Sequence, residues 1–433
     1  MASDGPASAV GLARLGRPDP AGTALGGGPA GAVPGEGAAA GGACPRPVRD
    51  PARLEPLALR RSLALTDRSA LEDLTISGVD ATALRLPLAR PIASALGRYS
   101  HVDCTVVDVH TRNGPSGQGF TACLGGSAGA AVALYIRDEL APAVVGGSVL
   151  APEALWHRAW GPNKARQRGG IGAWGLSALD TAVWDALARH AGLPLCTMLG
   201  GYRDRVPVYG SGGWHTLTDD ELVQECQRFA AQGIKAYKYK IGTTRDEART
   251  ARLRNAMGDS FALLADANQC YSVREAVAVG EMLADYGVVW LEEPVVADSV
   301  DDLAEVAKRS PTPTAAGENA YFRWGFREIV ERRAAAFLQP DIGRCGGVTE
   351  FRKIGALADA AGLALSSHLW HELSISLVGA FSSGWACEYA EFIPDGALTR
   401  SFDVVDGAIE IPNAPGHGAE FTPEARREFS VEY

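Results

Sequence analysis

The sequence predicts an α/β protein in which a closed parallel barrel follows an α+β module. From about Arg205, short apolar strands alternate with amphipathic helical stretches, and polar residues follow most strands at a nearly constant spacing. Repeated strand–helix units of this size indicate a parallel sheet, and seven or more of them favour closure into a barrel. Between about residues 74 and 200, strands come first and helices follow, which is typical of an α+β module.

Composition limits the class of protein. The chain has 433 residues, 46% of them hydrophobic, and a formal net charge of -10. That length can bury one large core and a smaller second domain, and the negative charge argues against a nucleic-acid partner. No apolar run approaches the roughly 18 to 20 residues that span a bilayer. The eight cysteines contain no C-x-x-C pair, so we expect mostly buried thiols in a reducing compartment, the cytoplasm.

Residues 1–72 are rich in Gly, Ala and Pro. Such a segment cannot offset the entropy of ordering itself, so we expect a disordered extension. It lacks the continuous apolar core of a secretory signal. Its arginines (Arg14, Arg17, Arg46 and Arg49) leave a transit peptide open, and a start codon assigned too far upstream would explain the segment equally well.

The predicted α+β module, residues 73–200, begins with strands at 74–87 and 102–110. A glycine-rich stretch at 113–119, which is typical of a hairpin turn, follows them. The clearest helix is expected at 174–190, because leucine and valine recur there every three or four residues on one face.

A polar loop at residues 160–170 lies between these elements and carries Lys164, Arg166 and Arg168. Three cations in a glycine-bounded loop could clamp an anionic substrate, so Arg168 is a candidate substrate contact. A solvated loop without such a role is the alternative.

The predicted barrel domain spans residues 201–392. We expect its strands at 206–209, 236–241, 262–267, 288–291, 314–316, 336–338 and 364–366, with one more possible strand from about Trp385. Amphipathic segments such as 219–231 bridge them. Residues 393–433 are rich in Pro and Gly, and we expect them to return to the N-terminal module.

The strand at residues 235–242 carries the first chemical signal. Side chains alternate across a strand, so Lys238 and Lys240 face one side while Tyr237 and Tyr239 face the other. Two ammonium groups on one buried face make each other lose a proton more easily, which suits a lysine base. A solvated edge strand with ordinary lysines would show the same short motif.

Polar residues lie at the ends of the predicted barrel strands, at nearly regular intervals along the sequence. One strand–helix unit occupies roughly 25 residues in a barrel of about 200 to 250 residues. The observed steps are 26, 26, 26, 23, 27 and 20 residues, between Lys240, Asp266, Glu292, Glu318, Asp341, His368 and Glu388. We therefore expect these seven side chains to ring the C-terminal mouth of the barrel, where such folds place their sites.

Asp266, Glu292 and Glu318 are three carboxylates from successive strands. Converging carboxylates need a divalent cation to offset their repulsion, and all-oxygen ligation suits Mg²⁺. A structural salt-bridge cluster is the alternative. Of the neighbours Glu292 and Glu293, strand alternation lets only one face inward.

His368 and Asp341 fall on neighbouring predicted strands. A carboxylate that is hydrogen-bonded to an imidazole fixes its tautomer and raises its basicity, so this pair could be a second acid/base opposite Lys240. Glu388 could donate a hydrogen bond to a developing oxyanion if it stays protonated. A surface role for Glu388 is the alternative, since Glu391 is close.

The motifs Lys-x-Lys, Asp-x-Asn, Glu-Glu-Pro, Gly-Glu-Asn, Pro-Asp and Ser-Ser-His-Leu occur in this order. With their spacing, they make roughly residues 74–433 resemble the mandelate racemase subgroup of the enolase superfamily. The resemblance implies a modified TIM barrel, (β/α)₇β, with an α+β capping domain. It also implies an essential Mg²⁺, with Asp266, Glu292 and Glu318 as its ligands, and a substrate contact from Asn268. A Lys or His base beside a metal ion is a known pattern of that superfamily.

The resemblance assigns further roles to the ring residues. Lys240 would be one acid/base, while Lys238 lowers its pKa and helps to hold the substrate carboxylate. His368 with Asp341 would be the other acid/base. Glu388 would donate a hydrogen bond to the enolate oxygen.

The expected chemistry is removal of the α-proton of a carboxylate substrate to give an enediolate. We expect dehydration of a sugar acid, an aldonate or an aldarate, to a 2-keto-3-deoxy acid. The cationic cap loop and the residues expected near the mouth suit a hydroxyl-rich ligand, dicarboxylic ones included: Ser211, Trp214, His215 and His371. Racemisation or epimerisation of a 2-hydroxy acid, and cycloisomerisation of a sugar lactone or anhydro acid, stay open. A non-catalytic sugar-acid binder would require the loss of a base or ligand, and none is missing. We also expect a homo-oligomer.

Overall fold

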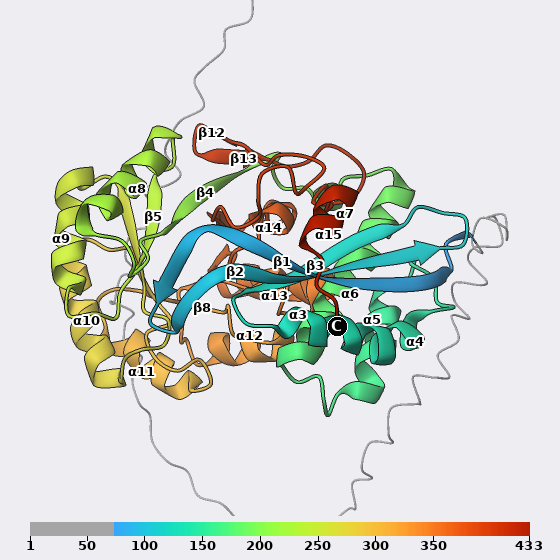
Figure 1. Ribbon diagram of the computed structural model, residues 1–433. Coiled ribbons are helices and arrows are strands. Elements are labelled where there is room, and N and C mark those ends of the chain that lie inside the picture. Colours follow the sequence, from blue (N-terminus) through green and yellow to red (C-terminus); the bar gives the residue numbers. More distant parts are fainter. Residues whose placement is uncertain (1–72) are drawn as a thin grey trace, which may run out of the picture. The chain divides into compact units, whose positions relative to one another are not determined.

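The structure, a computed structural model, describes residues 73–433. The expected disordered extension at 1–72 lies outside the described residues. Eight parallel strands close into a barrel, in which consecutive strands are neighbours and the last strand pairs with the first (Figure 1). They are β4 (Arg205–Gly212), β5 (Ala236–Lys240), β6 (Ala262–Asp266), β7 (Trp290–Glu292), β8 (Thr314–Ala316), β9 (Phe337–Leu338), β10 (Ala364–Ser366) and β11 (Gly384–Tyr389). The predicted closed barrel is confirmed.

Seven helices connect these strands. They are α8 (Asp219–Ala231), α9 (Asp246–Met257), α10 (Val273–Asp285), α11 (Val300–Arg309), α12 (Phe322–Glu331), α13 (Gly347–Ala361) and α14 (His371–Val378). The Thr218 side chain caps α8 by accepting a hydrogen bond from the Glu221 N–H, and the Glu221 carboxylate accepts one from the Thr218 N–H. Such a capping box satisfies two N–H groups at the start of a helix. Here it also fixes the end of the loop that leaves β4 at the barrel mouth.

An antiparallel sheet of three strands precedes the barrel: β1 (Ile76–Ser94), β2 (Gly97–Thr111) and β3 (Gly117–Leu124). The helices α3 (Ala128–Tyr135), α4 (Ala141–Val144), α5 (Pro152–Asn163), α6 (Gly170–Ala191) and α7 (Leu195–Met198) follow it, with a π-helical turn at Ile136–Leu140. The strands and the long helix expected from the sequence are present, and β2 and α6 extend beyond the expected bounds. Gly117 and Gly119 do more than shape a hairpin. A Cβ on Gly117 would lie 2.2 Å from the Ala182 carbonyl oxygen, so glycine lets β3 approach α6.

The α+β module packs on the barrel beside the predicted ring of polar residues. The Thr121 hydroxyl on β3 donates to the Gly343 carbonyl at 2.8 Å, two residues after Asp341. The Trp184 indole on α6 donates to the Thr349 hydroxyl on α13 at 2.9 Å. The module therefore holds the segment that follows β9.

The C-terminal segment contacts both parts. Strand β13 (Ala408–Glu410) pairs antiparallel with β4, and β12 (Val404–Val405) pairs with β13. After α15 (Pro423–Phe429), the Val431 N–H donates to the Ala83 carbonyl on β1 at 2.9 Å. Arg426 also forms a 2.7 Å ion pair with Asp108 on β2. The segment after β11 therefore contacts both β4 of the barrel and the antiparallel sheet.

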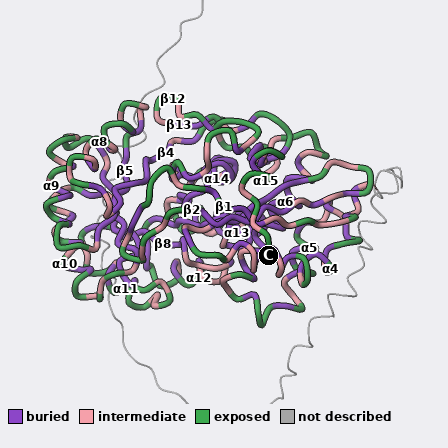
Figure 2. The backbone as a smooth tube through the Cα atoms, in the orientation of Figure 1, coloured by how far each residue is buried: buried purple, intermediate pink, exposed green. Residues whose placement is uncertain are grey.

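The barrel interior is apolar below its mouth. Figure 2 shows buried backbone along the barrel strands and the antiparallel sheet. We call the lower layer the apolar floor: Tyr209, Ala236, Leu264, Trp290, Ala315, Phe337 and Ala386. Ala236 precedes Lys238 on the same face of β5, and Trp290 precedes Glu292 on the same face of β7. Polar groups at the mouth therefore stand on a base of low polarity.

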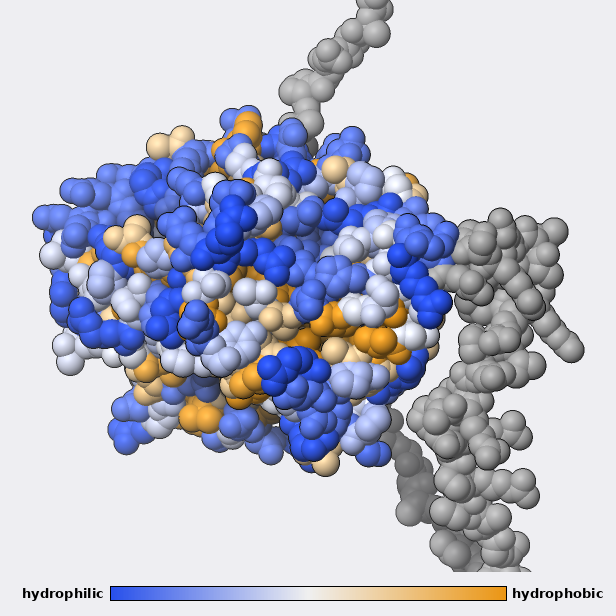
Figure 3. All heavy atoms as spheres, turned by 45° about the vertical axis from the view of Figure 1, so that its right-hand side comes forward, coloured by the Kyte–Doolittle hydropathy of each residue, from blue (hydrophilic) through white to orange (hydrophobic). Residues whose placement is uncertain are grey.

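On the face in Figure 3, hydrophilic side chains predominate, and apolar ones gather in a band near the middle of the view. Within residues 73–433 no helix is long and apolar enough to cross a membrane. Of the cysteines in this range, Cys270 is exposed and Cys123 is half-buried. The others are buried, as expected for thiols in the core: Cys104, Cys196, Cys226, Cys345 and Cys387.

Candidate active site

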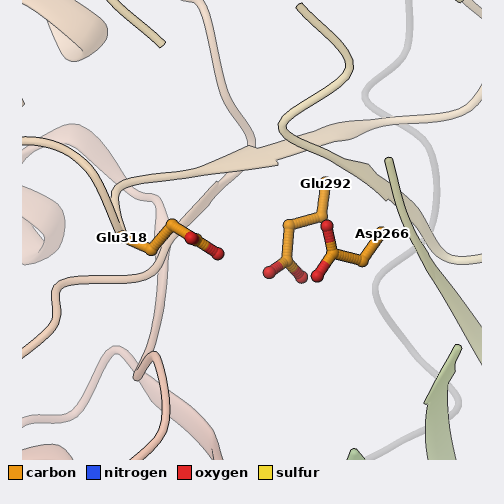
Figure 4. Close-up of side chains that lie close together, drawn as sticks. All are labelled: Asp266, Glu292 and Glu318. Atoms are coloured by element: carbon orange, nitrogen blue, oxygen red, sulfur yellow. The ribbon is translucent and has the colours of Figure 1, made fainter. Parts of the chain in front are cut away.

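Three carboxylates converge at the barrel mouth. Asp266 and Glu292 end β6 and β7, and Glu318 follows β8 (Figure 4). One carboxylate oxygen of each lies within 4.8 Å of the others, and all three residues are buried. Gly317 makes the turn into Glu318 at φ +139°, where a Cβ would lie 2.9 Å from the Gln339 nitrogen. Of the two neighbouring glutamates, Glu292 joins this cluster.

The cluster has the properties of a divalent-cation site. Burial raises the pKa of Glu292 to about 8, with Lys238 opposing the rise and the other carboxylates adding to it. Glu318 Oε2 is buried and has no hydrogen-bond partner within residues 73–433. Three buried carboxylates with an unpaired oxygen need positive charge, and a hard cation with oxygen ligands supplies it. The residues present therefore fit the expected Mg²⁺.

Lys240 lies on one flank of the carboxylate cluster. Its ammonium group donates a short hydrogen bond to Asp266 and lies 4.9 Å from the centre of the Trp214 ring. The residue is only 6% exposed. Tyr237 and Tyr239 face the opposite way, toward Glu225 on α8 and Thr250 on α9, so the predicted alternation along β5 is present.

Lys238 lies one pleat below Lys240 on the apolar floor. Its side chain is 0% exposed, and its ammonium nitrogen is 2.7 Å from carboxylate oxygens of both Glu292 and Glu388. Although burial opposes the charge, these carboxylates hold the pKa of Lys238 well above its usual value. In this structure the charge of Lys238 is therefore matched by two carboxylates of the ring, and its contact with a substrate carboxylate stays a prediction.

His368 lies on the other flank of the cluster. Its Nδ1 is 2.7 Å from Asp341 Oδ2, and its Nε2 is 3.4 Å from Glu318 Oε2. The Gly343 N–H donates to the other Asp341 oxygen at 2.7 Å and so fixes the carboxylate. Burial opposes protonation of the imidazole, but Glu318 and Asp341 together raise its pKa. Lys240 and His368 thus contact opposite ends of one carboxylate cluster.

Glu388 lies among hydrogen-bond donors and cations. Its carboxylate accepts hydrogen bonds from the Ser211 hydroxyl at 2.6 Å and the Leu369 N–H at 3.0 Å, and it pairs with Lys238 at 2.7 Å. Burial alone would raise its pKa, but the surrounding cations, Lys238 foremost, lower the pKa of Glu388 to about 2. These donors favour the ionised form. The role of Glu388 as a donor to an enolate oxygen stays a prediction.

The expected substrate contacts separate into two groups. Trp214 and Asn268 lie at the mouth, and the Asn268 side-chain oxygen is buried without a hydrogen-bond partner in the described range. Arg168 is exposed in the bend before α6. His215 binds the Ile241 carbonyl, and His371 packs on a tyrosine ring, with burial lowering its pKa to about 3. The loop that carries Arg168 passes close to the residues that follow β8, since a Cβ on Gly169 would lie 2.9 Å from the Tyr321 ring, and a substrate contact of Arg168 stays a prediction.

Arg344 is a part of the site that sequence reasoning missed. Its Nε lies 3.4 Å from Asp341 Oδ2, and its Nη1 donates to the Glu318 carbonyl at 3.2 Å and the Asn319 side-chain oxygen at 3.3 Å. Asn319 in turn donates to Glu293 at 2.8 Å. This network joins the His368 partner to the third carboxylate of the cluster. Its sequence signal was an arginine in the turn three residues after Asp341.

Comparison with known proteins places this geometry in a family. Residues 78–200 match the model of the mandelate racemase / muconate lactonizing enzyme N-terminal domain, and residues 221–425 match the enolase C-terminal domain-like model. The chain is 32% identical over 338 residues to 3,6-anhydro-alpha-L-galactonate cycloisomerase of Streptomyces coelicolor, covering 77% of this chain and 93% of that relative. It is 30% identical over 330 residues to arabinonate dehydratase of Saccharolobus solfataricus, covering 73% and 88%. L-talarate dehydratase from Polaromonas sp. JS666, solved in complex with Mg and L-glucarate, superposes with a TM-score of 0.78 at 29% identity, covering 83% of this chain and 98% of that one.

The fold and site define an enolase-superfamily enzyme. The chain belongs to the mandelate racemase / muconate lactonizing enzyme family of that superfamily, which confirms the resemblance found in the motifs. Its relatives include dehydratases, cycloisomerases and an epimerase, so membership establishes the class of enzyme and leaves the reaction to be argued from the site.

Proposed function

We propose that the enzyme removes the α-proton of a sugar acid in a Mg²⁺-dependent reaction and dehydrates the substrate to a 2-keto-3-deoxy acid. One observation carries this proposal: Lys240 and His368 contact the carboxylate cluster from opposite ends, at Asp266 and at Glu318. A substrate carboxylate at the cluster would present its α-carbon between two groups that can move a proton.

Asp266, Glu292 and Glu318 would hold the metal. Bound Mg²⁺ polarises the substrate carboxylate, which makes the neighbouring C–H more acidic. The protein contributes position and protons. One of Lys240 Nζ and His368 Nε2 accepts the α-proton, and His368 Nε2 delivers a proton to the departing β-hydroxyl. Asp341 holds Nδ1 and leaves Nε2 facing the cluster.

The remaining polar groups keep the two bases in place. Ser211 and the Leu369 N–H hold Glu388, which with Glu292 anchors Lys238 beneath the mouth. Charges that are fixed before the reaction need no rearrangement when new charge develops. We assign Lys238 and Glu388 to positioning.

Cycloisomerisation is the second candidate. The observation that favours it is the 32% identity to 3,6-anhydro-alpha-L-galactonate cycloisomerase over 93% of that relative. It requires the same two proton-moving groups, but the bond that breaks joins the β-carbon to a ring oxygen, which takes the proton and stays in the product, so no water is lost. Racemisation would use them on opposite faces of one carbon. A homo-oligomer and a cytoplasmic location stay predictions.

The test is a screen of aldonates, aldarates and their anhydro or lactone forms with Mg²⁺, read as formation of a 2-keto acid. Dehydration predicts a 2-keto-3-deoxy product with loss of water. If no such product forms while the substrate exchanges its α-proton for deuterium in D₂O, dehydration is wrong and an isomerase reaction replaces it.

Lys240→Ala and His368→Ala should each abolish turnover and leave the far-UV circular dichroism unchanged. The exposed Lys308 and His190 supply matched controls, Lys308→Ala and His190→Ala, which should retain the wild-type rate. Wild-type turnover in either site variant would remove that residue from the mechanism.

A further inference from the structure

A cavity of about 490 Å³ opens beside the active site. It lies between the end of β1 and the α8 side of the barrel, and the His215 N–H holds the end of β1 there through the Ala93 carbonyl at 2.8 Å. Ser211 and Trp214 line it, and these residues contact Glu388 and Lys240. The cavity, which we call the mouth cavity, is therefore separated from the catalytic cluster by a single layer of side chains.

The charged lining of the mouth cavity carries an excess of one negative charge. It consists of two arginines and three glutamates: Arg90, Arg228, Glu221, Glu225 and Glu391. Arg228 forms a bidentate pair with Glu391, at 2.7 and 2.8 Å. Arg90 is shared between Glu225 at 3.4 Å and Glu221 at 3.6 Å. Both guanidinium groups in the lining are thus already committed to carboxylates, and neither is left for an anion on a ligand.

The other lining groups suit a neutral, hydroxylated ligand. Carboxylate oxygens accept hydrogen bonds from hydroxyl groups, and Gln224 adds an uncharged donor and acceptor. The Trp214 and Phe392 rings, whose centres are 6.0 Å apart, offer aromatic surface for C–H groups of a sugar chain. A second carboxylate on the ligand would meet net negative charge and would lose water without gaining a cation.

We propose that the mouth cavity receives the end of the substrate remote from the reacting carboxylate, and that it selects sugar acids with a single negative charge. Aldonates and their anhydro forms are then substrates, and aldarates are discriminated against. This inference rests on the proposed function, because it takes the carboxylate cluster as the site of the first carboxylate.

The test compares sugar acids that differ only at the terminal carbon, such as gluconate with glucarate and galactonate with galactarate. Affinities are measured by calorimetry on the Mg²⁺-loaded enzyme at low ionic strength, together with kcat/KM. The aldonate of each pair should bind and react at least about fivefold better, the effect expected of one charge near partly exposed groups. The ratio should shrink as salt is added, because the lining is partly exposed and salt screens it.

A charge-changing variant sharpens the test. Glu221→Gln with Glu391→Gln changes the net charge of the lining from −1 to +1 and releases Arg228. It should raise the aldarate-to-aldonate ratio of kcat/KM by about tenfold or more. The control, Glu305→Gln with Glu331→Gln, removes two exposed glutamates on α11 and α12 that pair with Arg309 and Arg327, and it should leave the ratio unchanged.

The outcomes separate the two proposals. Aldonate preference in binding without a 2-keto-3-deoxy product would support the selectivity and overturn the dehydration. Equal or better binding and turnover of aldarates would overturn the selectivity and leave the dehydration standing. An enzyme that binds and converts no member of any pair would overturn both.

Discussion

Replacing Lys238 with methionine tests the electrostatics of the barrel mouth without knowledge of the substrate. Methionine keeps an unbranched side chain in the apolar surroundings but removes the ammonium group that lies 2.7 Å from both Glu292 and Glu388. Both carboxylates remain buried without that cation. Breaking a buried ion pair by removing one partner costs about 3 to 5 kcal/mol.

That cost converts into a melting temperature. Unfolding entropy is about 2.1 cal/mol/K per residue, or roughly 0.8 kcal/mol/K for the roughly 360 residues that the structure describes. Lys238→Met should therefore lower Tm by about 4 to 7 °C when measured in EDTA. The control is Lys308→Met, which removes an exposed lysine on α11 and should change stability by less than about 0.5 kcal/mol.

Mg²⁺ should reduce the difference in Tm between the wild type and Lys238→Met. A cation bound by Glu292 replaces part of the lost charge, so the Tm deficit of Lys238→Met in excess Mg²⁺ should be smaller than in EDTA. A variant within about 1 °C of wild type in EDTA would refute the assignment of Lys238 as a charged group that neutralises two buried carboxylates.

Three other substitutions probe the site and the contact beneath the cap. Asp341→Asn keeps the shape of the side chain and removes the charge 2.7 Å from His368 Nδ1. A loss of about 4 kcal/mol of transition-state stabilisation predicts that kcat falls about a thousandfold, with unchanged circular dichroism. A fall in kcat below tenfold would contradict the role of Asp341. Glu318→Gln should weaken Mg²⁺ binding at least about tenfold in a calorimetric titration without substrate, and wild-type affinity would remove Glu318 from the ligand set. Burial raises the pKa of Asp180 to about 7, opposed by hydrogen bonds from Thr349. A raised carboxyl pKa gives stability that is present at acid pH and is lost as pH rises toward 7, at about 1.4 kcal/mol per pH unit. Asp180→Asn should therefore flatten the decline of Tm between pH 5 and 7, and an unchanged slope would contradict the shift.

The spacing of the site residues along the chain, and the face of the strand on which each lies, could be predicted because both depend on local rules. Lys240, Asp266 and Glu292 are the last residues of β5, β6 and β7, and one strand–helix unit separates each from the next. The two-residue period of a strand then sends Lys240 inward and Tyr239 toward the helices. Neither rule needs knowledge of distant contacts, so periodicity alone located the mouth of the barrel.

Depth within the barrel could not be predicted in this way. Lys238 and Lys240 share one strand face and look equivalent in sequence, yet Lys238 is fully buried between Glu292 and Glu388, while Lys240 lies under Trp214 at the mouth. The partners come from different strands, and only the closed barrel shows that they meet.

The hydrogen-bond donors around Glu388 limit which groups of the site can move a proton. A carboxyl group that already accepts from Ser211 and Leu369 and pairs with Lys238 gains nothing from holding a proton, because each of these donors favours the ionised form. Lys238 is likewise held in its charged form by its two carboxylates. Of the seven ring residues, three form the carboxylate cluster and Asp341 orients the imidazole, so Lys240 and His368 are left as the groups that can move a proton. Loss of turnover in both Lys240→Ala and His368→Ala, with the wild-type rate kept in the controls Lys308→Ala and His190→Ala, is the kinetic result that this assignment requires.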